Sequence, residues 1–202
     1  MKLYYSPGAC SLSPHIVANE LGLNIELIKV NLKNHTLEDG KDFFEINPKG
    51  YVPALEIKEG EVLTEGPAIV QYMGDQNTEA GVVPKASTLE RYHLQEMLGY
   101  INSELHKTCS MLFNPNIKPE VAEERREYLK KRYTYLNDLL KDREFVMGDH
   151  FTAVDAYLFT ITNWAPSLKL DLSAFTNITN FQKRMAERPS VKRALKEEGL
   201  IQ

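Results

Sequence analysis

One of the chain's two cysteines, Cys10, stands in the run YSPGACSLSPHI, after a Pro-Gly turn and before residues with helical spacing. The start of a helix carries about half a positive charge and unpaired N–H groups, and both favour the thiolate, the reactive form of sulfur. The position of Cys10 therefore predicts a reactive thiol. Cys109 lies in the apolar stripe of a longer helical pattern, where a small buried hydrophobic side chain is the simpler interpretation.

The run CSLS is similar to the C-x-x-C motif of redox proteins, with Ser13 in place of the second thiol. A dithiol site can form an internal disulfide, whereas a monothiol site needs an outside thiol, which in a cytosol is usually glutathione. Cys10 therefore predicts chemistry with a small external thiol. Two free thiols in a reducing compartment fit the sequence better than a Cys10–Cys109 bridge.

Two later runs contain residues that could bind other parts of a ligand such as glutathione. In LTEGPAI, Glu65 and Gly66 stand at the start of a predicted helix, where backbone N–H groups bind carboxylates and a glutamate can bind an ammonium group. This pair suits an α-amino acid such as the γ-glutamyl group of glutathione, although Glu65 alone would also complement the helix dipole. In NPKGYVPAL, Pro53 pushes Val52 to an extended backbone; an ordinary loop proline is the alternative.

A polar stripe runs along a later helical pattern, beside its apolar one. Gly99, Ser103, His106 and Ser110 follow one another at spacings of four, three and four residues. Residues at this spacing share a helix face, so the stripe suits the wall of a cleft. An exposed helix histidine is the alternative interpretation of His106.

The elements that must position these residues divide the chain in two. Up to residue 79 the patterns predict strands and helices in the order β-α-β, an irregular stretch, then β-β-α, which is typical of a thioredoxin-like domain. The predicted segments are strands at 2–5, 25–32 and within 53–63, and helices at 11–21 and 66–73.

Gly81 and Pro84 mark a linker, and from residue 87 the patterns are helical only. These helices are predicted at 88–113, 121–144, 153–165 and 180–199, the last split at Pro189. The expected fold is therefore an α/β thioredoxin-like N-terminal domain (1–79) plus an all-α helical-bundle C-terminal domain (87–202). A cleft between two domains is the default place for a ligand.

Composition narrows the classes of partner. The chain has 202 residues and a net charge of −4, which argues against nucleic acid or an anionic membrane as the main partner. The sequence has neither an apolar run of the ~18 residues that a spanning helix needs nor a signal-peptide core at its start. The histidines lack metal-ligand spacing, and neither a phosphate loop nor a serine-hydrolase elbow is present. We expect a cytoplasmic protein without a metal.

Together, the runs YYSPGACSLSPHI, NPKGYVPAL, LTEGPAIVQYM, ELHK and FTAVDAYL resemble the bacterial beta-class glutathione S-transferases over essentially the whole chain. The resemblance implies a homodimer that uses glutathione as co-substrate and transfers its thiol to a hydrophobic electrophile. It implies that Cys10 lies at the glutathione sulfur and can form a mixed disulfide with it. It also implies a cis Pro53, with Val52 holding the cysteinyl backbone and with Glu65 and Gly66 holding the γ-glutamyl end.

From the helical domain, the resemblance places Ser103, His106 and Lys107 in the glutathione site, with His106 and Cys10 as the catalytic pair. Tyr5 and Ser11 are alternative hydroxyl donors. The chain departs from the family's pattern at His35, where a lysine is common, and at Gly99, where an asparagine that reaches the other subunit is common. His35 would then meet the glycine end of glutathione when protonated.

Two other functions are alternatives. A glutaredoxin-like thiol–disulfide reductase or a reductive dehalogenase shares these residues. A non-catalytic relative that binds a protein, as stringent-starvation proteins bind RNA polymerase, predicts a damaged glutathione pocket, and the intact Cys10, Glu65 and His106 argue against it.

The electrophile pocket is expected near Phe113, Tyr157 and Trp164. Thr152 and Asp155 have the spacing of a helix capping box, which predicts a structural role.

Overall fold

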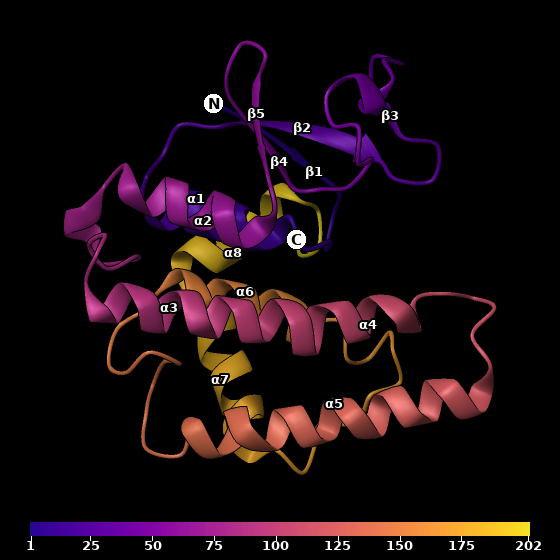
Figure 1. Ribbon diagram of the computed structural model, residues 1–202, viewed down its shortest axis with the longest axis vertical. Helices are drawn as coiled ribbons and strands as arrows, with labels where there is room; N and C mark the ends of the chain where they lie inside the picture. Colours follow the sequence, from indigo (N-terminus) through magenta and orange to yellow (C-terminus); the bar gives the residue numbers. More distant parts are fainter.

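The first part of the chain forms a five-stranded mixed sheet with the strand order β3-β2-β1-β4-β5 in the computed structural model, which describes residues 1–202 (Figure 1). The central strand β1 pairs in parallel with β2 and antiparallel with β4, so Leu3 lies between Leu27 and Leu55. The strands are β1 (Lys2–Tyr5), β2 (Glu26–Asn31), β3 (Thr36–Leu37), β4 (Ala54–Lys58) and β5 (Glu61–Thr64). The edge strand β3 lies in the stretch for which the sequence predicts no regular element.

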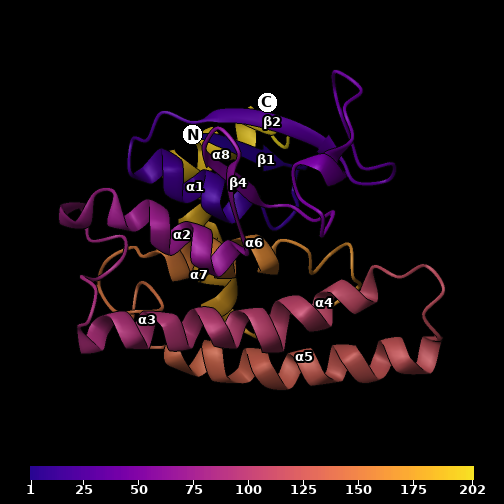
Figure 2. The same cartoon turned by 45° about the horizontal axis from the view of Figure 1, so that its top comes forward.

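Two helices, α1 (Leu12–Glu20) and α2 (Gly66–Asp75), lie between the sheet and the later helices in both views (Figure 1 and Figure 2). Every residue of α1 from Leu12 to Ala18 is buried. The reason is that α1 packs against α2, α6 (Ala153–Thr162) and α8 (Pro189–Glu197), and shares one hydrophobic core with Leu3 of the sheet. The helix predicted at 11–21 is therefore enclosed by its neighbours.

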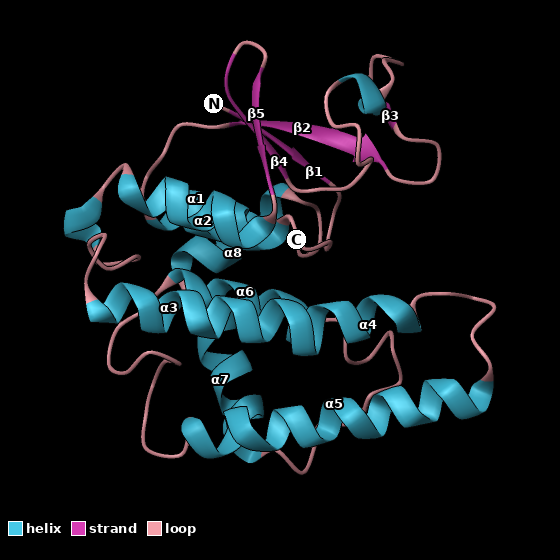
Figure 3. Ribbon diagram, viewed as in Figure 1, coloured by secondary structure: helices cyan, strands magenta, loops and turns pink.

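The rest of the chain is helical, with long rods that run side by side (Figure 3). Helix α3, a π-helical segment η3 and helix α4 form one nearly continuous rod that is antiparallel to α5 (Figure 1). The helices are α3 (Leu89–Tyr100), η3 (Ile101–His106), α4 (Lys107–Leu112), α5 (Pro119–Leu139), α6 (Ala153–Thr162), α7 (Thr176–Glu187) and α8 (Pro189–Glu197), and two short 3₁₀ turns are η1 (Phe43–Glu45) and η2 (Thr78–Ala80). None of these helices has the length and apolar character needed to span a bilayer.

The predicted fold class, a thioredoxin-like α/β part followed by an all-α bundle, is confirmed by this order of elements. The sheet-side elements end with α2 at Asp75, and the first long helix of the bundle begins at Leu89. The boundaries at residues 79 and 87 stay a prediction.

One hydrophobic core runs through both parts of the chain. It joins 40 buried residues, among them Leu3 of the sheet, Ile16 of α1 and Leu158 of α6. All ten residues of α6 are buried, as its all-round apolar sequence predicts. A smaller cluster on the other face of the sheet holds Val52 against Phe43. The two parts are therefore packed as one body, which fixes the walls of any cleft between them.

A buried arginine reinforces the connection near the linker. Arg91 of α3 donates to both carboxylate oxygens of Asp75 at 2.8 Å, and also to the Pro84 carbonyl at 2.8 Å. The bidentate geometry is the strong form of this interaction, and the hydrogen bonds from Arg91 hold the pKa of Asp75 below its usual value. The contact ties the end of α2 to the start of α3.

The predicted capping box at the start of α6 is confirmed. The buried Asp155 carboxylate accepts hydrogen bonds from the Thr152 amide and the Val146 amide, both at 2.8 Å, and from the Thr152 hydroxyl at 3.0 Å. Burial raises the pKa of Asp155 to about 6 despite these donors. The side chain thus joins the loop before α6 to the helix itself, and it lies outside the cleft described below.

Replacing Asp155 with alanine should lower the free energy of unfolding by about 2–6 kcal/mol, because two buried amides lose their acceptor at about 1–3 kcal/mol each. The control is Asp149→Ala, since the Asp149 side chain is 99 % exposed, and it should change stability by less than about 0.5 kcal/mol. Urea denaturation of the two variants measures the difference. Equal midpoints for Asp155→Ala and the wild type would contradict a structural role for the box.

Candidate active site

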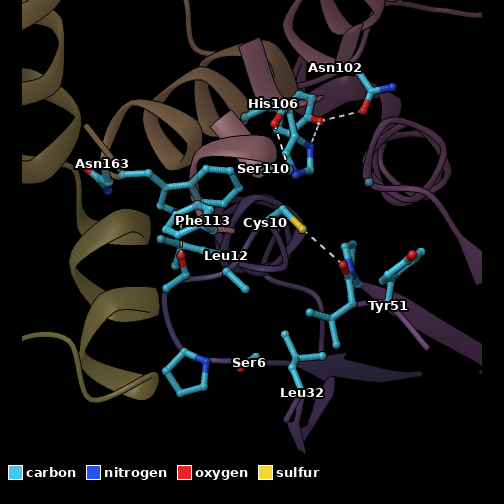
Figure 4. Close-up of a pocket in the computed structure, with 18 of the residues that line it drawn as sticks. Ser6, Cys10, Leu12, Leu32, Tyr51, Asn102, His106, Ser110, Phe113 and Asn163 are labelled. Carbon is cyan, nitrogen blue, oxygen red and sulfur yellow. Dashed lines mark hydrogen bonds between the residues drawn. The ribbon is translucent and has the colours of Figure 1, made fainter. Parts of the chain in front are cut away.

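A cleft of about 1360 Å³ opens between the sheet-side loops and the helical bundle. One wall consists of the loops that precede α1, β4 and α2, and the other of side chains from η3, α4 and α6, together with residues that follow α6 (Figure 4). Of the residues predicted to be catalytic or to bind glutathione, all except His35 line this cleft. Their individual roles toward a ligand stay predictions.

Cys10 lies just before α1, and its Sγ–H donates to the Val52 carbonyl at 3.1 Å (Figure 4). The turn that presents it is closed by the next residue: the Ser11 hydroxyl accepts from the Ser6 amide at 3.1 Å and donates to the Ser6 carbonyl at 3.3 Å. Ser11 is fully buried, and neither Ser11 nor Tyr5 lines the cleft. The structure therefore gives no support to these two side chains as alternative hydroxyl donors.

The surroundings of Cys10 do not favour the thiolate that its place at a helix start predicts. Burial raises the pKa of Cys10 to about 12, although the backbone N–H groups of Cys10 and Ser11 lower it. Desolvation disfavours the charged form more than these donors stabilise it. Cys10 is therefore a neutral thiol at neutral pH, and it acts as a hydrogen-bond donor.

The loop before β4 carries the second predicted feature. The Val52–Pro53 peptide bond is cis, as the family resemblance implies. Val52 is packed in the smaller core cluster, and its amide makes no hydrogen bond within the chain. The Val52 backbone therefore has a free donor and a carbonyl at the edge of the cleft.

His35 does not reach the cleft. Its Nδ1 atom lies 3.1 Å from the Gly50 carbonyl, and its ring packs on Phe44 with centroids 4.5 Å apart. These contacts turn the ring toward the loop that leads to Val52. The predicted contact of His35 with the glycine end of glutathione has no support in this geometry.

At the start of α2, Glu65 holds a left-handed backbone with a φ of 69°, which is uncommon for a residue with a side chain. Its carboxylate pairs with the Lys49 ammonium at 2.7 Å, and Lys49 also donates to the Thr64 hydroxyl at 2.9 Å. Lys49 lines the cleft but is missing from the predicted set. Lys49 stands in the run NPKGYVPAL quoted above, so a positive charge next to the predicted Val52 site was the available signal in the sequence. One end of the cleft thus combines a carboxylate, an ammonium group and a helix start.

The opposite wall is built on the π-helical segment, where the Lys107 amide bonds to the Asn102 carbonyl five residues back. Its turn carries Asn102, Ser103, His106 and Lys107 into the cleft, whereas Gly99 does not line it. The His106 Nδ1 atom lies 2.6 Å from the Tyr157 hydroxyl, which donates to Asn102 Oδ1 at 3.0 Å. Asn102 is missing from the predicted stripe, although it stands three residues after Gly99 and four before His106, and this spacing was the available signal.

Burial lowers the pKa of His106 to about 4, and the positive charge of Lys107 lowers it further. The ring is therefore neutral at neutral pH. The predicted electrophile residues Phe113, Tyr157 and Trp164 all line the cleft. Trp164 donates to the Gly8 carbonyl at 2.8 Å and packs edge-on against Phe113, with centroids 5.4 Å apart. Phe113 and Trp164 thus give this side of the cleft an aromatic surface, beside the polar Asn163 and Ser167.

Comparison with known proteins agrees with this geometry. Residues 8–76 match the family model of the glutathione S-transferase N-terminal domain, and residues 100–189 match that of the C-terminal domain. The glutathione S-transferase GstA of Escherichia coli O157:H7 is 45 % identical, over 99 % of this chain and all of its own length. The chain therefore belongs to the glutathione S-transferase family.

Two solved structures show which class of the family the chain resembles. The beta-class glutathione S-transferase of Sphingomonas chungbukensis is 42 % identical with a TM-score of 0.95, and the two chains cover each other completely. A sphingomonad glutathione S-transferase complexed with glutathione is 40 % identical, also with a TM-score of 0.95 and complete coverage of both chains. The predicted resemblance to bacterial beta-class enzymes is confirmed.

Without a ligand, alkylation of Cys10 by iodoacetamide should rise about tenfold per pH unit from about pH 7 to about pH 10, because only the thiolate reacts. This expectation follows from the raised thiol pKa of about 12. Mass spectrometry of the Cys10 peptide measures the rate, and glutathione alkylated in parallel samples that contain no protein is the control. A rate for Cys10 that levels off below about pH 8 would show a thiolate that the buried geometry excludes.

Proposed function

We propose that the cleft binds glutathione and that the protein transfers the glutathione thiol to hydrophobic electrophiles. One observation carries the proposal: Cys10, the free Val52 amide, the Glu65–Lys49 pair and His106 all border one cleft, which Phe113 and Trp164 also line with aromatic surface. The sphingomonad relative complexed with glutathione supports this choice of ligand.

The γ-glutamyl end of glutathione fits the start of α2. Its ammonium group would meet the Glu65 carboxylate, and its carboxylate would meet the Gly66 amide at the positive end of the helix. Lys49 already pairs with Glu65 at 2.7 Å. The ammonium group of glutathione would therefore share the Glu65 carboxylate with Lys49 or displace Lys49 from it. A displaced Lys49 is free to bind the carboxylate of glutathione.

The cysteinyl residue fits beside Val52, whose amide and carbonyl can pair with its backbone as a neighbouring strand would. This register puts the glutathione sulfur near Cys10 on one wall and near His106 on the other (Figure 4). Ser103 and Lys107 lie on the same wall as His106 and complete the proposed set. Lys107 supplies the positive charge that His35, turned toward Gly50, does not.

In this site the glutathione thiol loses its proton and the thiolate attacks the electrophile. The Cys10 thiol is neutral, so it can donate a hydrogen bond to the thiolate, and the start of α1 adds positive potential. Phe113 and Trp164 would hold a flat apolar electrophile beside the sulfur. A new C–S bond forms, and the electron pair of the broken bond leaves with the displaced group.

Cys10 gives the site a second reaction, thiol–disulfide exchange. Its thiolate would attack a sulfur of glutathione disulfide, forming a mixed disulfide and releasing one glutathione thiolate. The sulfur of Cys10 borders the cleft, which favours this reaction, while its raised pKa limits the rate. Transfer needs no bond to Cys10, so it is the main activity in this proposal, and reductase chemistry is secondary.

The proposed assembly is a homodimer, and the proposed location is the cytoplasm. Large hydrophobic side chains are exposed at Tyr51, Leu89 and Tyr92, which suits a covered surface. Cys10 and Cys109 are both free, as in a reducing compartment. A non-catalytic protein-binding role would tolerate a damaged pocket, and the intact cleft argues against it.

Isothermal titration with glutathione tests the proposal. The wild type should bind saturably, and Glu65→Gln should raise the dissociation constant about three- to tenfold, because it removes one exposed charge from the binding site. Glu61→Gln is the matched control, since Glu61 is exposed on β5 outside the cleft, and it should bind as the wild type does.

The same preparations should conjugate glutathione to an aryl halide. Absence of binding at millimolar glutathione would contradict the proposal and would bring the protein-binding role to first place. Binding with disulfide reduction but without conjugation would make the reductase role the main one.

A further inference from the structure

Three side chains form a hydrogen-bonded chain along the helical wall. Asn102 and His106 come from the π-helical segment, and Tyr157 comes from the buried helix α6 (Figure 4). The Tyr157 oxygen lies 2.6 Å from His106 Nδ1 and 3.0 Å from Asn102 Oδ1. Tyr157 is itself buried, with 3 % of its surface exposed.

The single proton of the tyrosine hydroxyl determines which group donates in each of these hydrogen bonds. A tyrosine hydroxyl has one proton, and here it is donated to the Asn102 carbonyl oxygen. The Tyr157 oxygen can therefore only accept at its other contact, so His106 Nδ1 must carry a proton and donate it. Because the His106 ring is neutral, its second nitrogen, Nε2, then has a lone pair and no proton.

We propose that Asn102 is a positioning residue, which acts through Tyr157 to hold His106 in the Nδ1–H tautomer with Nε2 as a proton acceptor toward the cleft. The inference rests on the proposed function for its catalytic consequence. The S–H bond of bound glutathione would break, its proton would move to Nε2, and the electron pair would stay on sulfur as the thiolate.

The order of donors and acceptors in these hydrogen bonds suits this proton transfer. After it, the imidazolium still donates from Nδ1 to Tyr157, which still donates to Asn102, so no other hydrogen bond has to reverse. The negative sulfur holds the proton on Nε2, since a neighbouring opposite charge favours the charged form of histidine. Without Asn102, the Tyr157 hydroxyl would be free to donate to Nδ1, which would put the ring proton on Nε2 and remove the acceptor.

Long-range ¹H–¹⁵N correlation spectra of the full-length, ligand-free protein test the tautomer, with His106 assigned by comparison with His106→Gln. The wild type should show the proton on Nδ1. Asn102→Ala should move it to Nε2, and Asn102→Asp, which keeps an acceptor oxygen, should leave it on Nδ1. Asn114→Ala is the matched control, because Asn114 lies outside the cleft.

Steady-state kinetics supply the second readout. Asn102→Ala should lower kcat about tenfold, less than the roughly 10²–10⁴-fold that general acid–base catalysis contributes, because the histidine itself remains. Its KM for glutathione should change by less than about twofold, and Asn102→Asp should restore most of the rate. A wild-type proton on Nε2, or an Asn102→Ala variant with an unmoved proton, overturns the proposal whatever the rate. Failure of the wild type to bind glutathione would instead reject the proposed function, because the tautomer is measured without ligand.

Discussion

The enclosure of α1 is the interaction on which the rest of the structure depends. This helix carries Cys10 at its start, and it is buried from Leu12 to Ala18 between the sheet layer and the helices α6 and α8. The same burial makes one core of the two parts of the chain. Cys10 and His106 come from different parts of the sequence, so their positions across the cleft are only as fixed as this packing.

Burial also determines the charge states of three side chains in the site. It raises the pKa of Cys10 to about 12, lowers that of His106 to about 4 and raises that of Tyr157. All three side chains are therefore neutral hydrogen-bonding groups at neutral pH, while the charges of Glu65 and Lys49 sit at one end. The negative charge in the reaction therefore comes from the sulfur of the ligand. The Cys10 thiol reacts with modifying reagents only after it has lost its own proton.

Most of the fold and much of the site follow from the sequence, because local patterns determine them. Helical periodicity, turn residues and the capping box at Thr152 and Asp155 need only neighbouring residues to be recognised. The features that the sequence does not predict depend on packing between distant segments. The desolvation of Cys10, the turn of His35 toward Gly50 and the π-helical placement of Asn102 are of this kind.

Ultraviolet absorbance of the glutathione thiolate bound to the protein tests the central claim most directly. Cys10 and Cys109 both have pKa values raised to about 12, so they add no thiolate signal near neutral pH. Glutathione bound to the wild type and to Cys10→Ala should ionise with a midpoint below about 7.5, the range of activated thiols. A midpoint unchanged from the usual thiol value of about 8.5 would show that the cleft does not stabilise the thiolate, and would contradict the account.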